Sequence, residues 1–365
     1  MKKVLILGGG YAGLSFIKNL HLDALGDYQF TLISKENEHY TSILLHNVAS
    51  AGKNITLAYE KILPRQIEFI QDEIKEIKDA AVVGKKAEYN YDILVIALGF
   101  SSDDFGIKGV KDYAHSMVNY HNSLDIHRKL ETLLQEGQKD IVVCGAGFTG
   151  IELLGNLAND WASKANLHCV EAMPAILPMF DSDLALKAKN YLEERGVNFE
   201  LGAKILELKQ NSVIVEKNGE QKELKSDFTF WTAGVKGNEV MQNSPFFKTA
   251  RSKVEVNAFL NPIQQKKEMK NIFVLGDCAA LKDEATGRFY PPTAQMAEQQ
   301  GKYLAGIFNS NLTSSEPFSY NNKGTICSVG YSYAVGVIGG VSIRGILANY
   351  LKRIIEAKWI LKLKF

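Results

Sequence analysis

Two groups of glycines have the spacing that most directly suggests chemistry. Each group has the form GxGxxG, and each follows an apolar segment and precedes a helix-like one. In this pattern the first glycine makes a tight turn, the second lets a pyrophosphate approach the backbone, and the third permits close packing of helix on strand. The helix N-terminus then attracts the phosphates. The sequence therefore predicts two dinucleotide sites, formed by Gly8, Gly10 and Gly13 and by Gly145, Gly147 and Gly150.

The residue that ends the second strand of such a unit meets the adenosine ribose. It follows the third glycine by 21 residues in both copies, and it is Ser34 in the first and Glu171 in the second. A carboxylate at Glu171 suits the ribose 2′-hydroxyl of NAD, and no Arg or Lys follows closely to accept a 2′-phosphate, so NADH is predicted over NADPH. The alternative is that Glu171 is an ordinary solvated charge. In the first copy Ser34 and Lys35 replace the usual acidic partner.

The elements that position these residues follow from the apolar runs along the chain. Strands are predicted at 4–7 and 30–33 around the first glycine turn, and at 141–144 and 167–170 around the second. Two further apolar runs lead to Gly99 and to Gly276 with Asp277. A carboxylate at the carboxyl end of a strand lies where doubly wound sheets bind ligands, within reach of a polyol hydroxyl. The fold class is therefore α/β, with two Rossmann-like dinucleotide-binding domains.

Composition restricts the class of protein. The chain has 365 residues, enough for about two or three domains, and its 46% apolar and 23% charged residues are typical of globular proteins. A net charge of +1 gives no field that attracts nucleic acid, so no nucleic-acid partner is expected. The four cysteines contain no CxxC pair, which favours a reducing cytosol and indicates neither a metal site nor a disulfide framework.

Two segments have features in common with membrane-targeting signals and must be distinguished from them. The N-terminal apolar run is too short for a signal peptide before its glycines. Residues 324–343 are uncharged over the length of a membrane-spanning helix, but they contain five glycines, each of which costs about 1 kcal/mol in a helix interior. Glycine-punctuated strands are therefore predicted there.

Seven segments carry a resemblance to a known family. They are 8–13, 39–52, 144–152, 170–180, 231–235, 273–278 and 293–301. Together they resemble the two-dinucleotide flavoproteins of the glutathione-reductase-like fold, and within that family the type II NADH:quinone oxidoreductases. The resemblance implies that residues 1–106 and 261–315 bind FAD, that 107–260 bind NADH, and that 316–365 associate with the membrane. It also implies hydride transfer from NADH to FAD, followed by transfer of two electrons to a membrane quinone.

The same resemblance extends to individual site residues. Asp277 would contact the FAD ribitol, Gly99, Gly276 and Ala294 would belong to the FAD site, and Gly234 would belong to the NADH site. The segment TAQMAEQQG is similar to the AQxAxQ signature that lines the quinone site beside the flavin in this family. Independently of that likeness, Thr293 is suited to be a helix N-cap, and Gln295 and Gln299 then share one helical face. The alternative is a polar surface helix.

Glu152 has two interpretations that the sequence does not separate. We expect it in the first turn of the helix that follows the second glycine turn, where the helix dipole favours a carboxylate. The resemblance instead places it near the nicotinamide and the quinone, whose reduction consumes two protons, so a proton relay is conceivable. His39 and His46 are interpreted as satisfied structural histidines.

The C-terminal residues predict an amphipathic helix. Its apolar side consists of Ile346, Leu347, Tyr350, Leu351, Ile354 and Ile355, and its other side of Asn349, Lys352, Arg353 and Glu356. Residues 344–365 contain six basic residues and one acidic residue, as expected for a helix on an anionic lipid surface. Trp359 and Phe365 are expected to anchor at the interface. A peripheral location on the cytoplasmic face of the cell membrane follows, and the alternatives are a core-docking helix or a homodimer interface.

Three other functions compete with the main one. A sulfide:quinone oxidoreductase needs a cysteine pair beside the flavin, and the only suitably separated candidates are Cys144 and Cys327. Cys144, however, lies on the strand before the glycine turn and faces the wrong side of it. A dithiol reductase is disfavoured because no cysteine occurs in the first 143 residues. A non-catalytic NADH-sensing flavoprotein is disfavoured by the glutamine-containing helix at 293–301.

Overall fold

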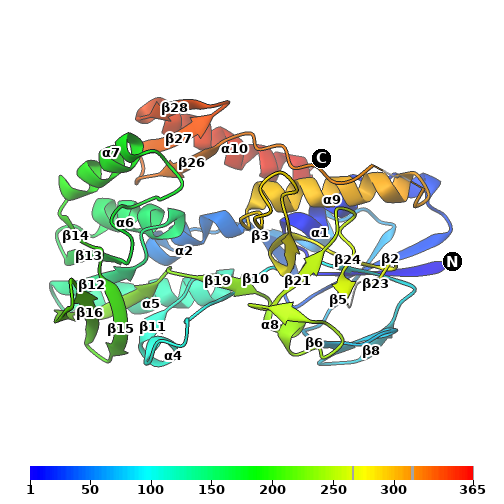
Figure 1. Cartoon of the computed structure of the whole chain (residues 1–365), viewed down its shortest axis with the longest axis horizontal. Helices are drawn as coiled ribbons and strands as arrows, with labels where there is room; N and C mark the ends of the chain where they lie inside the picture. The colour runs from blue at the N-terminus through cyan, green and yellow to red at the C-terminus, as the bar shows by residue number, and fades with distance from the viewer. Residues whose placement is uncertain (265–266, 314–315, 365) are drawn as a thin grey trace.

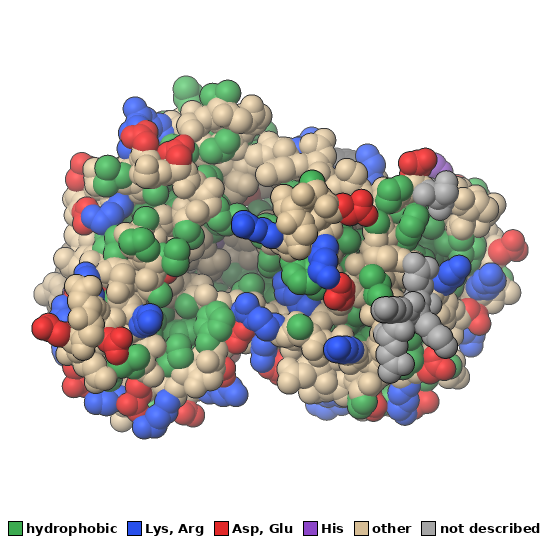
Figure 2. All heavy atoms as spheres, viewed as in Figure 1, with side chains coloured by type: hydrophobic (Ala, Val, Ile, Leu, Met, Phe, Trp, Pro, Cys, Tyr) green, Lys and Arg blue, Asp and Glu red, His purple; other side chains and the backbone are tan. Residues whose placement is uncertain are grey.

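The chain folds into two lobes that lie side by side (Figure 1). The computed structural model describes residues 1–264, 267–313 and 316–364. Each lobe is built on a five-stranded sheet, and the surface is hollowed between the lobes (Figure 2). The C-terminal helix α10 (Ile346–Lys364) lies along the same side of the molecule as helix α9 (Ala294–Asn309).

The first lobe contains a parallel sheet with β1 at its centre. Val4 pairs with Phe30 on one side and with Ile93 on the other. The apolar residues of these strands are almost completely buried, because helices and loops cover both faces of the sheet. The predicted strands at 4–7 and 30–33 and the two strands that lead to Gly99 and Gly276 are confirmed. In spatial order the strands are β24 (Ile272–Val274), β9 (Ile93–Ile96), β1 (Lys2–Leu7), β2 (Tyr28–Ser34) and β5 (Ile67–Gln71).

Helices α1 (Tyr11–Lys18) and α9 pack closely against each other in this lobe. A Cβ at Gly301 would lie only 2.3 Å from the carbonyl oxygen of Ala12, so glycine is required for this approach. The hydroxyl of Ser15 donates to the Glu298 carbonyl oxygen at 2.6 Å. The helix that carries Gln295 and Gln299 is therefore fixed to the helix that follows the first glycine turn.

The second lobe repeats the same arrangement. Its sheet is also parallel, and Ile141 pairs with both Leu167 and Phe228. The strands predicted at 141–144 and 167–170 are confirmed. In spatial order the strands are β11 (Ala114–His115), β18 (Phe228–Trp231), β12 (Lys139–Cys144), β13 (Ala165–Glu171) and β14 (Val197–Leu201), and the helices are α5 (Tyr120–Gln135), α6 (Phe148–Asp160) and α7 (Ser182–Glu193).

Smaller sheets and single turns complete the two lobes. Three-stranded sheets are formed by β6 (Ile74–Ile77), β7 (Ala81–Gly84) and β8 (Glu88–Asn90), by β15 (Lys204–Lys209), β16 (Ser212–Lys217) and β17 (Glu220–Lys225), and by β20 (Thr249–Ala250), β21 (Lys253–Val256) and β25 (Ala279–Leu281). Strand pairs are formed by β3 (Glu38–Tyr40) with β4 (Thr56–Ala58) and by β22 (Ile263–Gln264) with β23 (Lys267–Glu268). Short helices are α3 (Tyr59–Ile62), α4 (Val110–Tyr113), α8 (Glu239–Gln242), η1 (Leu22–Ala24), η2 (Ser42–Leu44) and η3 (Gly276–Cys278).

Two segments join the lobes. Strands β10 (Phe100–Ser102) and β19 (Val235–Gly237) form an antiparallel ribbon between them (Figure 1). Helix α2 (Leu45–Ala51) comes from the first part of the chain, but its Leu45 and Ala49 are buried in the core of the second lobe. After β19 the buried residues Met241, Phe247 and Val254 belong to the core of the first lobe. We therefore propose that the second domain ends near residue 237 rather than at 260.

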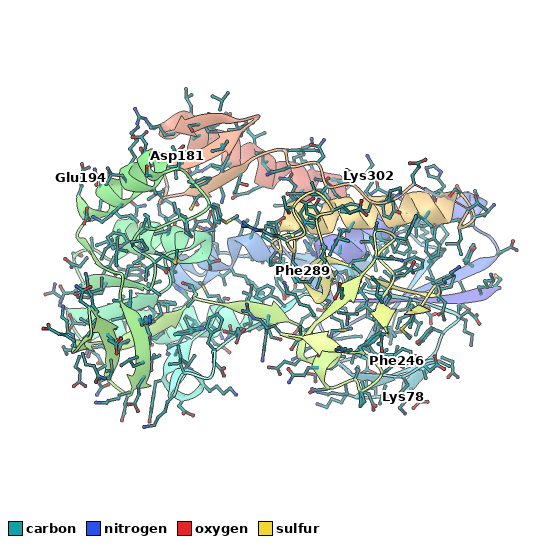
Figure 3. The ribbon with its side chains drawn as sticks, viewed as in Figure 1. Lys78, Asp181, Glu194, Phe246, Phe289 and Lys302 are labelled. Atoms are coloured by element: carbon teal, nitrogen blue, oxygen red, sulfur yellow. The ribbon has the colours of Figure 1, made fainter. Side chains whose placement is uncertain are left out.

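The uncharged segment 324–343 forms strands, as the sequence predicted. They are β26 (Thr325–Ser328), β27 (Ala334–Ile338) and β28 (Val341–Arg344), which make an antiparallel sheet. Asp181, labelled in Figure 3, accepts a hydrogen bond from the Ser342 hydroxyl at 3.2 Å beside this sheet. Within residues 1–264, 267–313 and 316–364, no helix has the length and apolar character needed to cross a membrane.

Candidate active site

The first glycine turn joins β1 to α1 and fits a dinucleotide. Gly8 has a φ of +96°, and a Cβ there would lie 2.4 Å from the Ala97 carbonyl oxygen. A Cβ at Gly13 would lie 2.1 Å from the Gly8 carbonyl oxygen, whereas one at Gly10 would have no described atom within 4 Å. Packing therefore requires the first and third glycines, and the second faces space into which a pyrophosphate fits. Gly10 is also the N-cap of α1, so no capping side chain competes for the first N–H groups.

The second glycine turn joins β12 to α6 in the same way. A Cβ at Gly145 would lie 2.7 Å from the Ala233 Cα, and one at Gly150 would lie 2.0 Å from the Gly145 carbonyl oxygen. A Cβ at Gly147, the N-cap of α6, would again have no described atom within 4 Å. Two turns with the same required and open glycines indicate two dinucleotide sites.

Gly234 lies on the strand connection beside the second turn. A Cβ there would lie 2.4 Å from the ring of Phe105, and the Gly234 carbonyl oxygen accepts a hydrogen bond from the Asp103 N–H at 3.1 Å. Glycine at this position is therefore explained by packing against the linker between the lobes. A contact with NADH remains a prediction.

Glu171 ends β13, and the structure holds its carboxylate in place. Oε2 accepts from the Ala146 N–H and Oε1 from the Met173 N–H, both at 2.8 Å. The carboxylate is therefore fixed beside the second glycine turn rather than free in solvent. Each oxygen keeps a second lone pair, with which it can accept from a ribose hydroxyl.

Ser34 and Lys35 occupy the corresponding position in the first lobe. The Ser34 hydroxyl lies 3.5 Å from the Tyr59 hydroxyl, and the Lys35 ammonium pairs with Glu73 at 3.3 Å. Lys35 is largely exposed, with 61% of its side chain accessible. The position that corresponds to Glu171 is thus bordered in the first lobe by a hydroxyl pair and an exposed cation rather than by a fixed carboxylate.

Gly276 and Asp277 lie at the carboxyl end of β24, as predicted. The Gly276 N–H donates to Gln300 Oε1 of α9 at 2.7 Å, which fixes this turn to the helix. Burial raises the pKa of Asp277, and the Lys253 ammonium opposes that shift. Gly99 lies nearby, since its carbonyl oxygen accepts from the Cys278 thiol at 3.2 Å.

Helix α9 begins as predicted, because the Thr293 hydroxyl accepts from the Met296 N–H at 3.1 Å. Gln295 and Gln299 share one face, and their side chains lie 3.4 Å apart. Both amides also bind the backbone of residues 321–324. Gln295 accepts from the Lys323 N–H at 2.8 Å and Gln299 donates to the Asn321 carbonyl oxygen at 2.8 Å. These glutamines therefore connect α9 to the chain that leads into β26.

Glu152 is buried at the centre of a polar cluster. It lies beyond the first turn of α6, so the expected first-turn position was wrong, since the helix begins only at Phe148. Its Oε1 forms an ion pair with Lys352 of α10 and accepts from the Ser328 N–H at 3.2 Å. Its Oε2 lies 3.5 Å from His46 Nδ1. Glu152 thus joins α2, α6, β26 and α10.

Burial and pairing act in opposite directions on this cluster. Burial alone would raise the pKa of Glu152, but the Lys352 ammonium and its hydrogen bonds lower it below the usual value. Glu356 is 3.9 Å from Lys352, and burial raises its pKa to about 7 despite that cation. Burial lowers the pKa of His46 to about 4, so His46 is neutral at pH 7.

Glu356 therefore predicts a pH-dependent stability. Its folded pKa of about 7 lies above the ordinary value of 4.5, so the folded state loses stability as pH rises through this interval. The titratable groups that interact with Glu356 are Lys352, Glu152, Arg353 and Tyr11. We expect Glu356→Gln to raise the free energy of unfolding by roughly 2–3 kcal/mol at pH 8.5 and to change it little at pH 4. Chemical denaturation at both pH values measures this, and a difference that does not vary with pH would contradict it.

Lys352 and Trp359 make contacts that the sequence did not reveal. Trp359 was expected to anchor at a lipid interface, and this was wrong, because its side chain is buried against Tyr11 with ring centroids 4.5 Å apart. Phe365, the other expected anchor, lies outside the described residues. A signal was present: the polar side of the helix carries Lys352 and Glu356 one turn apart, so it is not uniformly basic. A face that mixes charges suits docking on protein better than binding to an anionic surface.

The structural interpretation of the two histidines fits their surroundings. His39 Nδ1 lies 3.0 Å from the Gly9 carbonyl oxygen, and His39 Nε2 accepts from the Trp359 indole N–H at 3.1 Å. Burial lowers the pKa of His39 to about 4.

The cysteines do not form a redox pair among the described residues. Cys144 belongs to the core between the second sheet and β16, whereas Cys327 belongs to the core on the α6 side. All four cysteines are buried with free thiols, and burial raises the pKa of both the Cys144 and the Cys327 thiol. The described residues also contain no group of three or more potential metal ligands of the His, Cys, Asp and Glu types.

Comparison with known proteins agrees with this architecture. The sequence profile of the pyridine nucleotide-disulphide oxidoreductase family matches residues 2–301. The chain therefore belongs to the pyridine nucleotide-disulphide oxidoreductases. Type II NADH:quinone oxidoreductase of Staphylococcus epidermidis is 39% identical over 395 aligned positions, which cover 99% of this chain and 96% of the relative. That of Staphylococcus aureus is 36% identical with the same coverage. Within the wider family, the chain is thus a member of the type II NADH:quinone oxidoreductases.

Solved structures show the same fold. The structure of NDH2 from Plasmodium falciparum in complex with NADH has a TM-score of 0.89 at 18% identity, covering 100% of this chain and 96% of that one. The sulfide:quinone oxidoreductase of Aquifex aeolicus has a TM-score of 0.83 at 22% identity, covering 100% of this chain and 92% of that one. At these identities the likeness concerns the fold alone.

Proposed function

We propose that this protein oxidises NADH and reduces a quinone, with FAD bound in the first lobe. The observation that carries the proposal is the pair of glycine turns, each closed by packing at its first and third glycine and open at its second. Membership of the type II NADH:quinone oxidoreductases supplies the reaction. FAD supplies the two-electron redox chemistry, and the protein supplies binding, orientation and protons.

The chain's own residues divide into two binding roles. The turn at Gly8–Gly13 and Asp277 would hold FAD, with Gly99, Gly276, Ala294, Ser34 and Lys35 around it. The turn at Gly145–Gly150 and Glu171 would hold NADH. Hydride transfer needs close, oriented approach of the two rings and no acid or base, so positioning is the main contribution of these residues.

Glu152 and Lys352 are proposed to handle the protons that quinone reduction consumes. The pair is buried, charge-balanced and linked to Glu356, whose pKa of about 7 suits exchange of a proton near neutral pH. Gln295, Gln299 and Ala294 on α9 are proposed to line the quinone site. Their support is the common face of Gln295 and Gln299 and their attachment to residues 321–324.

The spectrum of the bound flavin tests the function. Purified protein is expected to be yellow with one FAD per chain, to lose the oxidised flavin bands on addition of NADH without oxygen, and to regain them on addition of a soluble quinone. Bleaching by sulfide instead of NADH would favour the sulfide:quinone alternative, which the separated cysteines disfavour. Bleaching by NADH without reoxidation by quinone would favour an NADH-sensing flavoprotein.

Glu171 is expected to determine the preference for NADH. A 2′-phosphate would meet a carboxylate whose two oxygens already bind backbone N–H groups, so NADH should be used in preference to NADPH by a factor on the order of a hundred in kcat/KM. Glu171→Arg should reverse or abolish this preference, and Glu171→Gln should weaken NADH use without improving NADPH use. Equal use of both nucleotides by the unaltered protein would contradict the assignment.

The exposed face of α10 is proposed to bind lipid on the cytoplasmic side of the membrane. Leu347, Ile354 and Ile355 have exposed fractions of 83%, 49% and 51%, and Val341 of the adjacent β28 has 64%. Lys352 and Lys362 pair within the protein, so Arg344, Arg353, Lys358 and Lys364 remain as the basic residues of the segment for an anionic surface. The apolar residues would lie in the interfacial zone of the bilayer.

Vesicle binding tests this surface. The triple variant Leu347→Ser, Ile354→Ser, Ile355→Ser is expected to bind phosphatidylglycerol-containing vesicles more than tenfold more weakly, since each buried aliphatic side chain contributes about 1.5–3 kcal/mol. Leu206→Ser is the control, because Leu206 of β15 is an exposed leucine at 37% and β15 lies on the opposite side of the molecule from α10 (Figure 1). If the unaltered protein does not bind vesicles, and the triple variant loses a dimeric state that the unaltered protein has, this face is a homodimer interface.

A further inference from the structure

Trp359 contacts the first glycine turn through a chain of hydrogen bonds. Its indole N–H donates to His39 Nε2 at 3.1 Å, and His39 Nδ1 lies 3.0 Å from the Gly9 carbonyl oxygen. Trp359 and His39 are 5% and 1% exposed. The C-terminal helix therefore reaches the second residue of the GGG sequence at the N-terminal end of the chain.

The partners determine the tautomer of His39. An indole N–H can only donate, so His39 Nε2 must accept and carries no proton. The proton of the neutral ring then lies on Nδ1, which donates to the Gly9 carbonyl oxygen. Burial keeps the ring neutral by lowering its pKa. If the indole N–H is removed, only the Gly9 carbonyl oxygen still favours the Nδ1–H tautomer, and Nε2 can hold the proton instead.

The Gly9 carbonyl oxygen is held by two donors. Besides His39, the Tyr59 hydroxyl donates to it at 3.0 Å, and a Cβ at Gly9 would lie 2.1 Å from that hydroxyl. The peptide unit is planar and trans, so the direction of the Gly9 carbonyl fixes the opposite direction of the Gly10 N–H. Gly10 is the position that faces open space at the N-terminus of α1.

We propose that Trp359 is a positioning residue for FAD. By fixing the Nδ1–H tautomer of His39, it holds the Gly9 peptide so that the Gly10 N–H points toward the site of the pyrophosphate. The C-terminal helix is thus part of the FAD site, and its Trp359 and Leu363 are buried in the core of the first lobe. This role rests on one part of the proposed function, that FAD binds at the first glycine turn, and does not depend on quinone being the electron acceptor.

The test compares Trp359→Phe with Trp161→Phe. Trp359→Phe removes the N–H donor and keeps an aromatic ring against Tyr11, whereas Trp161→Phe removes an indole N–H that donates to the Ser50 carbonyl oxygen at 3.1 Å, away from the first glycine turn. We expect Trp359→Phe to weaken FAD binding about tenfold, corresponding to the loss of one buried hydrogen bond. Trp161→Phe should change it less than twofold. FAD affinity is measured by flavin fluorescence on the protein stripped of flavin, and thermal unfolding is followed in parallel.

A second readout follows the tautomer directly. Nitrogen-15 NMR of His39 should show Nδ1–H in the parent protein and in Trp161→Phe, and a mixture with Nε2–H in Trp359→Phe. His39→Asn retains a donor for the Gly9 carbonyl oxygen but has no Nε2, so Trp359→Phe should have little further effect on FAD in that background. Comparing His39→Asn with the double variant His39→Asn, Trp359→Phe keeps the test valid if the single variant Trp359→Phe folds poorly.

Three results would overturn the proposal. They are an unchanged tautomer in Trp359→Phe, equal weakening of FAD binding by Trp359→Phe and Trp161→Phe, and additive effects of Trp359→Phe and His39→Asn. Each would reduce Trp359 to a packing residue. If FAD binds normally but quinone fails to reoxidise it, the proposed function fails and the role of Trp359 stands.

Discussion

Glu152→Gln should destabilise the protein by about 3–5 kcal/mol, the cost of removing one charge from a buried ion pair. The reason is Lys352, which is only 12% exposed and whose ammonium pairs with Glu152 while also donating to the Ile326 carbonyl oxygen at 3.2 Å. Glutamine keeps the shape of the side chain but removes the charge. Among the described residues, Lys352 then keeps only Glu356 as a carboxylate partner, at 3.9 Å and with a pKa of about 7. Chemical denaturation at pH 7 measures the loss.

The double variant Glu152→Gln, Lys352→Met supplies the control for this expectation. It removes both charges, so it should be more stable than Glu152→Gln alone, and the two changes should show a coupling energy of at least about 1 kcal/mol. Reoxidation of the flavin by quinone should be slow in the double variant as in Glu152→Gln, because both variants lack the carboxylate of the proposed proton site. Additive effects on stability would show that the two charges do not interact in solution.

Deleting residues 346–365 should cause loss of FAD and aggregation. The deletion removes Trp359 from Tyr11 and His39, and it removes Lys352 from the buried carboxylate of Glu152. It also exposes the surface that Leu363, fully buried, covers. Flavin content after gel filtration measures the outcome.

The triple variant on the exposed face of α10 distinguishes docking of this helix from its binding to lipid. Leu347→Ser, Ile354→Ser, Ile355→Ser leaves the inner face intact, so it should keep FAD and its melting temperature while losing vesicle binding. In the deletion of residues 346–365, a truncated chain that retains FAD and remains monodisperse would show that the inner face of α10 contributes little to the FAD site.

The positions of the glycine turns could be predicted because they depend on local sequence. Gly8, Gly13, Gly145 and Gly150 are required by contacts in and directly beside a single strand–turn–helix unit, and such units repeat a recognisable pattern. Glu171 could be predicted for the same reason, since its distance from the turn is set by one helix and one strand.

A core-docking helix was one of the alternatives for α10, but the face that docks and its partners could not be predicted, because its contacts are made by distant residues. Periodicity shows which side chains share a helix face, but not which face meets protein. On the polar side, Asn349 is buried and Lys352 meets a carboxylate of α6. Likewise, nothing near Gln295 and Gln299 in sequence indicated that their amides bind the backbone of residues 321–324.

The contact between His39 and Trp359 also constrains the order of events during synthesis, because it joins residues separated by 320 positions. A ribosome adds about 5–20 residues per second, so Trp359 is made on the order of tens of seconds after His39. During that interval the first glycine turn lacks the donor that fixes its histidine. FAD should therefore be bound at full affinity only after Trp359 has been synthesised and α10 has docked.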